Sequence, residues 1–500
     1  MSLPIAERSS RTHDLVLKAG RVIDPASGLD AVRDVAVDGA SVADVSETPL
    51  HGRLEVDVSG HVVCPGFIDL HSHAQSIAEH RLRALDGVTT ALELEGGVTP
   101  VGAAYDHLAQ RGRPINYGFS SSWAMARMAE VAGVDLGGRL DTFLRHINDP
   151  AWQRPASAED VSRIVGRLSA DLDAGAIGIG ILVGYAPLID PSEYLAVAEL
   201  AAGAGAPTFT HARELIEANP DTPIDGPSEI VQAAAATGAH MHYCHINSTS
   251  RRHIDRVHVL IERARSEGAT VTTEAYPYGA GSTAVGAWFL DPDRLHRMGL
   301  TPRSITYVRT GERIADAARL AELRETDPGG IVIVDFLDED DPDDRALLER
   351  AIVFEDAAVA SDAMPLTWTS RPPDAMTWPL PPGAVVHPRT SGTYARTLRT
   401  LVRERGLLTL PEAIRRCTLV PAQILADAVP AMRLKGRLEP GADADIVVFD
   451  PDTVTDNATY VDGTRPSSGI AHVIVAGEFV VRDTQIVPDA LPGRPVRAGG

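Results

Sequence analysis

Two histidines, His71 and His73, close an apolar run that begins at Cys64 and reads Cys-Pro-Gly-Phe-Ile-Asp-Leu-His-Ser-His. Side chains alternate along a β-strand, so both imidazoles point to one side and converge on one point. Imidazole is a common ligand of zinc, iron and nickel. Two exposed loop histidines are the alternative interpretation, but the apolar strand before them and further histidines along the chain favour a metal site.

Two more histidines, His211 and His245, each end a short apolar strand, and Asp362 ends another. If these strands belong to a β/α barrel, their carboxyl ends open at the same mouth as His71 and His73. A metal ion there lowers the pKa of bound water towards ~7, and a nearby carboxylate can accept its proton. We therefore expect a metal site with Asp362 as its general base.

The order of strands and helices between residues 63 and 419 predicts the fold that positions these side chains. Short apolar strands alternate with helical stretches, which favours an α/β protein with a (β/α)₈ barrel of the TIM type. The alternation of strands and helices becomes irregular at about 285–350, where we expect an insertion that forms a lid. Residues 1–62 and 420–500 are rich in strands and are expected to pair into one small β-sandwich domain. The clearest strands and helices lie at 66–70, 88–94, 177–181, 208–210, 271–273, Ser192–Ala202 and Pro227–Thr237.

Composition limits the partners and the compartment. The chain has 500 residues and a net charge of −22, which argues against nucleic acid or an anionic membrane surface as a partner. Three cysteines lie far apart and fit no disulfide framework, no stretch is long and apolar enough to span a bilayer, and Met1–His13 lacks an apolar leader. We expect a cytoplasmic protein that acts on a small molecule, and a homo-oligomer is compatible with the sequence.

These motifs, in this order, resemble the amidohydrolase superfamily and, within it, the N-acyl-D-amino-acid deacylase group. The resemblance covers nearly the whole chain and is specific because many motifs agree. They are Pro65-Gly-Phe-Ile-Asp-Leu-His-Ser-His73, Gly87-Val-Thr-Thr90, the two single histidines, Tyr276-Pro-Tyr278, Ser361-Asp362, His387-Pro-Arg389, Gly392-Thr393 and the closing run Lys435–Asp450.

The resemblance implies how the site residues divide between metals. His71 and His73 would bind one divalent metal and His211 and His245 another, with zinc as the expected ion and one or two ions per chain. Asp362 would be a further metal ligand and would hold and deprotonate the attacking water. Many members bridge their metals with a carboxylated lysine, but the only two lysines, Lys18 and Lys435, lie in the terminal β segments.

A glutamate is therefore expected in place of that bridge. Related deacylases use a cysteine after Gly-Val-Thr-Thr, but the run that follows Thr90 here is Ala-Leu-Glu-Leu-Glu-Gly-Gly. Strand alternation places Glu93 and Glu95 on one face, and Glu95 lies nearer the catalytic end. We favour Glu95 as the bridging ligand, with Glu93 as the alternative.

The substrate is less closely defined than the chemistry. The position where the deacylase group carries a carboxylate-binding lysine is Asn247 in this chain, which puts the usual N-acyl-D-amino acid in doubt. Other positions match substrate-side residues of the group or could compensate for the lysine. The expected substrate contacts are Tyr185, Arg213, Asn247, Tyr278, Ser282 and Arg389.

The leading prediction is a metal-dependent hydrolase of a carbon–nitrogen amide bond, most similar to a D-aminoacylase acting on an N-acyl amino acid. A second enzymatic interpretation is a mononuclear deaminase, because His211-Ala-Arg-Glu214 also fits a His-x-x-Glu pattern. A third, of another class, is a barrel without catalysis that serves in binding or assembly. The presence of all four histidines and Asp362 argues against the third.

Overall fold

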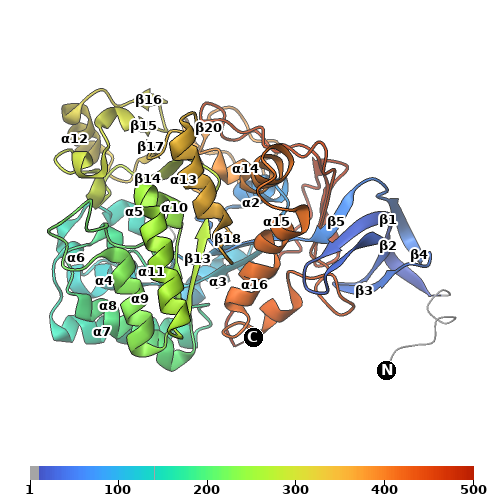
Figure 1. Ribbon diagram of the computed structural model, residues 1–500, viewed down its shortest axis with the longest axis horizontal. Coiled ribbons are helices and arrows are strands. Elements are labelled where there is room, and N and C mark those ends of the chain that lie inside the picture. Colours follow the sequence, from blue (N-terminus) through green and yellow to red (C-terminus); the bar gives the residue numbers. More distant parts are fainter. Residues whose placement is uncertain (1–10, 140, 500) are drawn as a thin grey trace.

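The computed structural model describes residues 11–139 and 141–499 (Figure 1). Residues 1–10 lie outside this described part, and with them most of Met1–His13, where the sequence predicts no apolar leader. Strands and helices alternate through the middle of the chain, whereas strands dominate both ends, so the protein is of the α/β class. Within the described ranges, no helix is both long enough and apolar enough to cross a membrane.

Eight short strands of the middle region run parallel to their neighbours, with β9 (Ser121–Ser122) as an added piece beside β10. Thr208 pairs with Ile179 on one neighbouring strand and with Met241 on the other, so the ends of these strands are level. Level parallel strands bring their carboxyl ends to one edge. The strands are β6 (Phe67–Asp69), β7 (Val88–Glu93), β8 (Asn116–Phe119), β10 (Ile179–Ile181), β11 (Thr208–Thr210), β12 (Met241–Tyr243), β13 (Val271–Ala275) and β18 (Ala358–Val359).

Backbone hydrogen bonds also join strands that belong to different sheets. The Ile177 amide donates to the Phe119 carbonyl at 2.9 Å, which connects the end of β8 to the start of β10. After β18, the Ala363 carbonyl accepts from the His73 amide at 2.8 Å, and the Ala363 amide donates to His71 at 3.3 Å. The segment that carries His71 and His73 is thus held directly against the segment that carries Asp362.

Helices follow the strands and cover them on the outside (Figure 1). Their ends carry the expected signals: α7 begins with a capping box between Ser157 and Asp160, and α9 ends at Gly238 with φ +72°. The two helices expected from the sequence are α8 and α9. The larger helices are α2 (Ile77–Ala84), α3 (Val101–Ala109), α4 (Trp123–Ala132), α7 (Ala158–Asp173), α8 (Pro191–Ala204), α9 (Gly226–Thr237), α11 (Ile254–Ser266), α13 (Pro342–Val353), α14 (Arg389–Arg396), α15 (Leu410–Cys417) and α16 (Leu419–Leu425).

Both ends of the chain enter one nine-stranded sheet, seen at the right of Figure 1. β5 and β21 join the two ends by antiparallel pairing, with Cys64 opposite Val447. The sheet is mixed, because β1 pairs in parallel with β4 and β5 and antiparallel with β2. Its strands are β1 (Thr12–Asp24), β2 (Leu29–Asp38), β3 (Ser41–Ser46), β4 (His51–Asp57), β5 (Val62–Pro65), β21 (Ile446–Phe449), β22 (Ile470–Val475), β23 (Glu478–Arg482) and β24 (Gln485–Ile486).

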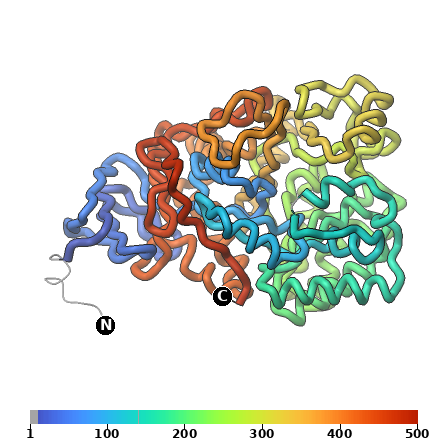
Figure 2. The backbone as a smooth tube through the Cα atoms, turned by 180° about the vertical axis from the view of Figure 1, so that it is seen from behind, coloured from blue at the N-terminus to red at the C-terminus, as the bar shows by residue number. Residues whose placement is uncertain are grey.

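The C-terminal segment continues past this sheet and lies along the middle region (Figure 2). The Val496 amide donates to the Tyr117 carbonyl at 2.7 Å, next to β8, and the Tyr105 hydroxyl donates to the Val496 carbonyl at 2.6 Å. The chain end therefore ties the two parts of the molecule together.

A separate antiparallel sheet occupies most of the segment in which an insertion is expected. Its strands are ordered β14-β17-β15-β16, and it lies with α12 at the upper left of Figure 1. The elements are β14 (Ala280–Ala284), β15 (Ile305–Tyr307), β16 (Glu312–Arg313), α12 (Ala317–Thr326) and β17 (Ile331–Asp335).

Candidate metal centre

The predicted ligands all follow the carboxyl ends of parallel strands. Two of them, His245 and Asp362, have left-handed backbone angles, with φ of +32° and +51°. Side chains with a Cβ rarely adopt this conformation, and such strain clusters at functional sites. Close packing also shapes the site, because a Cβ on Gly180 of β10 would lie 2.3 Å from the Glu95 carbonyl oxygen.

The carboxylate of Glu95 lies at the centre of the four predicted histidines. Its Oε1 is 2.6 Å from His245 Nε2 and 3.1 Å from His211 Nδ1. Its Oε2 is 3.2 Å from His71 Nε2 and 3.8 Å from His73 Nε2. One oxygen therefore faces each histidine pair, which is the arrangement that a bridging carboxylate requires.

Within each pair the ring nitrogens also face one another. His71 Nε2 and His73 Nε2 are 3.2 Å apart, and His211 Nδ1 and His245 Nε2 are 3.1 Å apart. Zinc–nitrogen bonds measure about 2.0–2.1 Å, so two nitrogens at this separation can share one ion. These donors fit a divalent metal well, since buried nitrogen and carboxylate oxygen atoms converge on two neighbouring points.

Asp362 lies at the edge of the His71–His73 pair. Its Oδ1 is 3.4 Å from His71 Nε2 and 3.6 Å from His73 Nε2. The same oxygen is 2.9 Å from Nη2 of Arg389, whose side chain is fully buried. The guanidinium therefore fixes the direction of the carboxylate that we expect to act as general base.

Buried charge in this site calls for a cation. Burial alone would raise the pKa of the Glu95 carboxyl, but the neighbouring His71, His245 and His211 hold it well below its ordinary value. Burial lowers the pKa of His71, yet Glu95, Asp362 and Glu274 outweigh it and raise the pKa well above its usual range. The carboxylates thus favour a positive charge at His71, and a divalent ion would supply that charge in place of the proton.

Two further carboxylates hold the far side of the first histidine pair. Glu274 of β13 accepts from Nδ1 of His71 at 2.5 Å and lies 3.2 Å from Nε2 of His242. Glu93 contacts Nδ1 of His73 at 2.8 Å. A carboxylate on the far nitrogen fixes the tautomer and ring orientation of a metal ligand. Sequence reasoning missed Glu274, although an acidic residue directly after the expected strand at 271–273 was a usable signal.

We expect Glu274→Gln to weaken metal binding by about 10–100-fold, because the amide orients the His71 ring less firmly than the carboxylate does. Titration of metal-free protein with zinc measures the affinity. Glu262→Gln, on the exposed face of α11, is the matched control and should bind as the native chain does. Equal affinity in all three proteins would show that Glu274 does not orient the ligand.

Comparison with known proteins agrees with this geometry. The Amidohydrolase family model matches residues 54–481. The chain is 31% identical to the N-acyl-D-glutamate deacylase of Alcaligenes xylosoxydans xylosoxydans (97% of this chain, 96% of the relative) and 28% identical to a D-aminoacylase of the same organism (95% of each). The structure of an N-acyl-D-glutamate deacylase from Bordetella bronchiseptica, complexed with zinc and a phosphonate inhibitor, matches with TM-score 0.75 and 26% identity, covering 98% of this chain and all of that one.

The chain belongs to the amidohydrolase family. The predicted resemblance is therefore confirmed, and so is the predicted reaction class, hydrolysis of a carbon–nitrogen amide bond. The expected metal cofactor is confirmed at the level of the family by the zinc in the solved relative. The alternative of a barrel without catalysis has no support.

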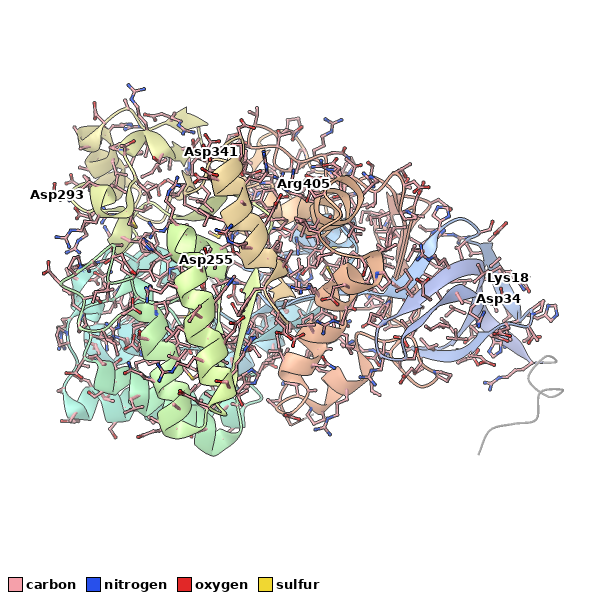
Figure 3. All side chains as sticks on the ribbon, viewed as in Figure 1. Lys18, Asp34, Asp255, Asp293, Asp341 and Arg405 are labelled. Atoms are coloured by element: carbon pink, nitrogen blue, oxygen red, sulfur yellow. The ribbon has the colours of Figure 1, made fainter. Side chains whose placement is uncertain are left out.

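The two lysines of this amidohydrolase lie in the terminal β segments, as the sequence predicts. Lys18 lies in β1 of the terminal sheet, 3.0 Å from Asp34 (Figure 3). Lys435 is 2.6 Å from Asp445 and 2.8 Å from Asp443. Both amines are paired with carboxylates of the terminal β segments.

Three of the six expected substrate contacts line a cavity of about 400 Å³ beside the metal centre: Tyr185, Arg213 and Ser282. The Tyr185 hydroxyl is 2.8 Å from Thr283 Oγ1, and its ring centroid is 4.8 Å from that of His211. Arg213 is fully buried and forms two hydrogen bonds to Glu229. The Ser282 hydroxyl donates to the Val332 carbonyl at 2.9 Å.

The other three residues, Asn247, Tyr278 and Arg389, are not among the residues that line this cavity. Asn247 donates to the Tyr276 carbonyl at 3.2 Å and accepts from the Tyr276 amide at 3.4 Å. The guanidinium of Arg396 lies over the Tyr278 ring, 4.4 Å from its centroid. Arg389 contacts Asp362, as described above, and its Nε and Nη1 are buried without a hydrogen-bond partner in the described structure.

The deaminase interpretation depends on Glu214, which also lines the cavity. Its Oε2 accepts from the Asn219 amide group at 2.8 Å. Among the described residues, the sets of donor atoms close enough to share a metal ion do not include Glu214, whereas Glu95 belongs to two of them. Glu95 lies between two histidine pairs, which suits two metals and favours the hydrolase over the mononuclear deaminase.

Proposed function

We propose that this amidohydrolase is a deacylase that cleaves the amide bond of an N-acyl amino acid. The observation that carries the proposal is the Glu95 carboxylate, which faces two histidine pairs while Asp362 lies at the edge of one of them. The relatives named as N-acyl-D-glutamate deacylase and D-aminoacylase support the substrate class.

The metal would be held by His71 and His73 at one position and by His211 and His245 at the other, with Glu95 between them. When bound, it would polarise the amide carbonyl and make water more acidic. Asp362 would accept the proton of the attacking water and later deliver it to the leaving nitrogen. The ion pair with Arg389 keeps the Asp362 carboxylate oriented towards the histidines during both transfers.

The proposal extends to the architecture of the two domains. We propose that the eight parallel strands close into a (β/α)₈ barrel over residues 63–419, with the sheet at 280–335 as its insertion. The hydrogen bonds from His71 and His73 to Ala363 support closure between the last and first strands. Residues 1–62 and 420–500 would form the composite sandwich, since apolar residues from both ends pack in one cluster.

The compartment and partners follow from charge and cysteine chemistry. The three cysteines, Cys64, Cys244 and Cys417, are buried and unpaired, which supports a reducing, cytoplasmic compartment. The net charge of −22 supports a small-molecule substrate over nucleic acid.

Metal removal tests the proposed centre without any substrate. We expect chelation to lower the melting temperature by several degrees, because a ligand at 1,000 times its Kd stabilises the folded state by about 4 kcal/mol. Differential scanning fluorimetry measures the shift, and elemental analysis gives the metal content. Two ions per chain would support the bridged centre, whereas one would show that only one of the two positions holds a metal.

A His211→Asn, His245→Asn double variant provides the control for that experiment. It should lack one of the two metal positions and show a smaller shift on chelation. A melting temperature that is insensitive to chelation in the native chain would contradict the proposed centre.

A further inference from the structure

Two histidines outside the predicted ligand set lie on the strand that leads to His245. His242 belongs to β12 and is fully buried, and His240 directly precedes that strand and is half-buried. Side chains alternate along a strand, so the two rings lie on one face of it. A buried ring nitrogen is costly unless it is hydrogen-bonded, so the partners of these rings indicate what they do.

Thr272 connects the two histidine rings. It lies on β13, in register with His242 on β12. Its Oγ1 atom is 2.9 Å from Nδ1 of His242 and 2.8 Å from Nε2 of His240. One hydroxyl group therefore contacts both rings.

Glu274 connects these residues to the predicted ligand His71. It lies two residues after Thr272 on β13, and so on the same face of that strand. Its Oε2 is 3.2 Å from Nε2 of His242, and its Oε1 is 2.5 Å from Nδ1 of His71. A continuous hydrogen-bond chain is thus formed by His240, Thr272, His242, Glu274 and His71.

The donors along this hydrogen-bond chain all point in one direction. An ionised carboxylate only accepts, so His242 donates to Glu274 from Nε2. A neutral imidazole that donates at Nε2 accepts at Nδ1, and the Thr272 hydroxyl therefore donates to that nitrogen. The hydroxyl has one proton, so it accepts from Nε2 of His240. Burial lowers the pKa of His240 to about 4, which leaves its ring uncharged at neutral pH with one N–H to donate.

The direction of these donors determines which nitrogen of His71 is free. The hydrogen bond from His242 holds one oxygen of Glu274, so the other oxygen stays in place to accept from Nδ1 of His71. A proton on Nδ1 leaves the lone pair on Nε2. That Nε2 atom is the one that faces His73 and Glu95, at 3.2 Å from each.

We propose that three residues position the metal ligand His71 through Glu274 and keep its Nε2 atom free for the ion: His242, Thr272 and His240. This inference rests on the proposed metal centre, with His71 as one of its ligands. None of the three lines the cavity beside that centre. They therefore act on metal affinity and contact neither the ion nor the substrate.

Thr272→Val tests the hydrogen-bond chain, because it removes one hydroxyl and keeps the shape of the side chain. Competitive titration of the metal-free protein with zinc measures the affinity of each metal position without any substrate. We expect the position that includes His71 to bind zinc about 10-fold more weakly, as outer partners of metal ligands do when they are removed. Thr272→Ser keeps the hydroxyl and should bind zinc as the native chain does.

Thr273→Val is the matched control, since Thr273 lies on the opposite face of β13 and donates to the Tyr243 carbonyl at 2.9 Å. It removes a buried hydroxyl from the same strand and should leave both zinc affinities unchanged. His242→Phe breaks the next link with a ring of similar shape and should weaken zinc binding at least as much as Thr272→Val. It keeps the inference testable if Thr272→Val does not fold, which the melting temperature of each metal-free variant shows.

Three results would overturn the inference. One is a zinc affinity in Thr272→Val and His242→Phe equal to that of the native chain. Another is an equal loss in Thr272→Ser or Thr273→Val, because the effect would then belong to the packing of β13 and not to the hydroxyl. The third is a native chain that binds no zinc, which would also overturn the proposed metal centre and is thereby distinguished from the other two.

Discussion

Asp362→Asn is expected to lower kcat by about 10²–10⁴-fold, because the amide cannot accept the proton of the attacking water. The loss should appear in kcat more than in KM, since the carboxylate acts on the reacting atoms. The amide keeps the shape of the side chain and its place beside Arg389, so the fold and the metal content should stay close to those of the native chain. Steady-state kinetics together with elemental analysis measure both quantities.

Asp293→Asn is the control for that variant, because Asp293 lies at the surface of the insertion, remote from the strand ends (Figure 3). Its rates should equal those of the native enzyme. If Asp362→Asn kept kcat within a factor of three while the metal content was unchanged, Asp362 would not be the general base.

Glu95→Gln is expected to remove at least one metal ion per chain and to reduce activity by a factor of 10³ or more, as estimated from the loss of a central charged ligand. Its carboxylate contacts both histidine pairs, at 2.6 Å from His245 and 3.2 Å from His71. An amide carries no charge to balance two cations. Metal content per chain is the decisive measurement.

Glu93→Gln is the matched comparison, because Glu93 lies two residues earlier and its carboxylate contacts the far nitrogen of His73. We expect this variant to keep its metal stoichiometry and to lose affinity to a smaller extent. The reverse result, with metal lost in Glu93→Gln and kept in Glu95→Gln, would assign the bridge to Glu93.

The arrangement of the four histidines was predictable because each one ends an apolar strand. Parallel strands bring their carboxyl ends to one edge, so the spacing of His71, His73, His211 and His245 along the chain implies convergence in space. Glu95 lies two residues past the end of β7, at the same edge. Local sequence pattern is sufficient for such groups, because their position depends only on where a strand ends.

Contacts across the interior could not be read from the sequence in the same way. Glu274 reaches His71 from 203 positions away in the chain, and that contact depends on how the strands pack. Asn247 was expected to face the substrate, but its amide binds the backbone of Tyr276. Arg213 was a candidate for a substrate carboxylate, yet Glu229 already occupies its guanidinium.

The strand pairings of the terminal and inserted sheets could not be inferred from the sequence either. β1 is long enough to pair with β4 through Thr12–Lys18 and with β5 through Arg21 and Val22, so its parallel partners could not be inferred from strand lengths alone. Strands β15 and β16 are only three and two residues long, which is too short for a recognisable alternation.

The most direct test of the central claim is release of free amino acid from N-acyl amino acids by the zinc-loaded protein, compared with the same protein after chelation. We predict steady release from at least one substrate, its loss on chelation and its return when zinc is restored. A protein that binds its metal in full and releases no amino acid from either apolar or acidic substrates would contradict the deacylase assignment.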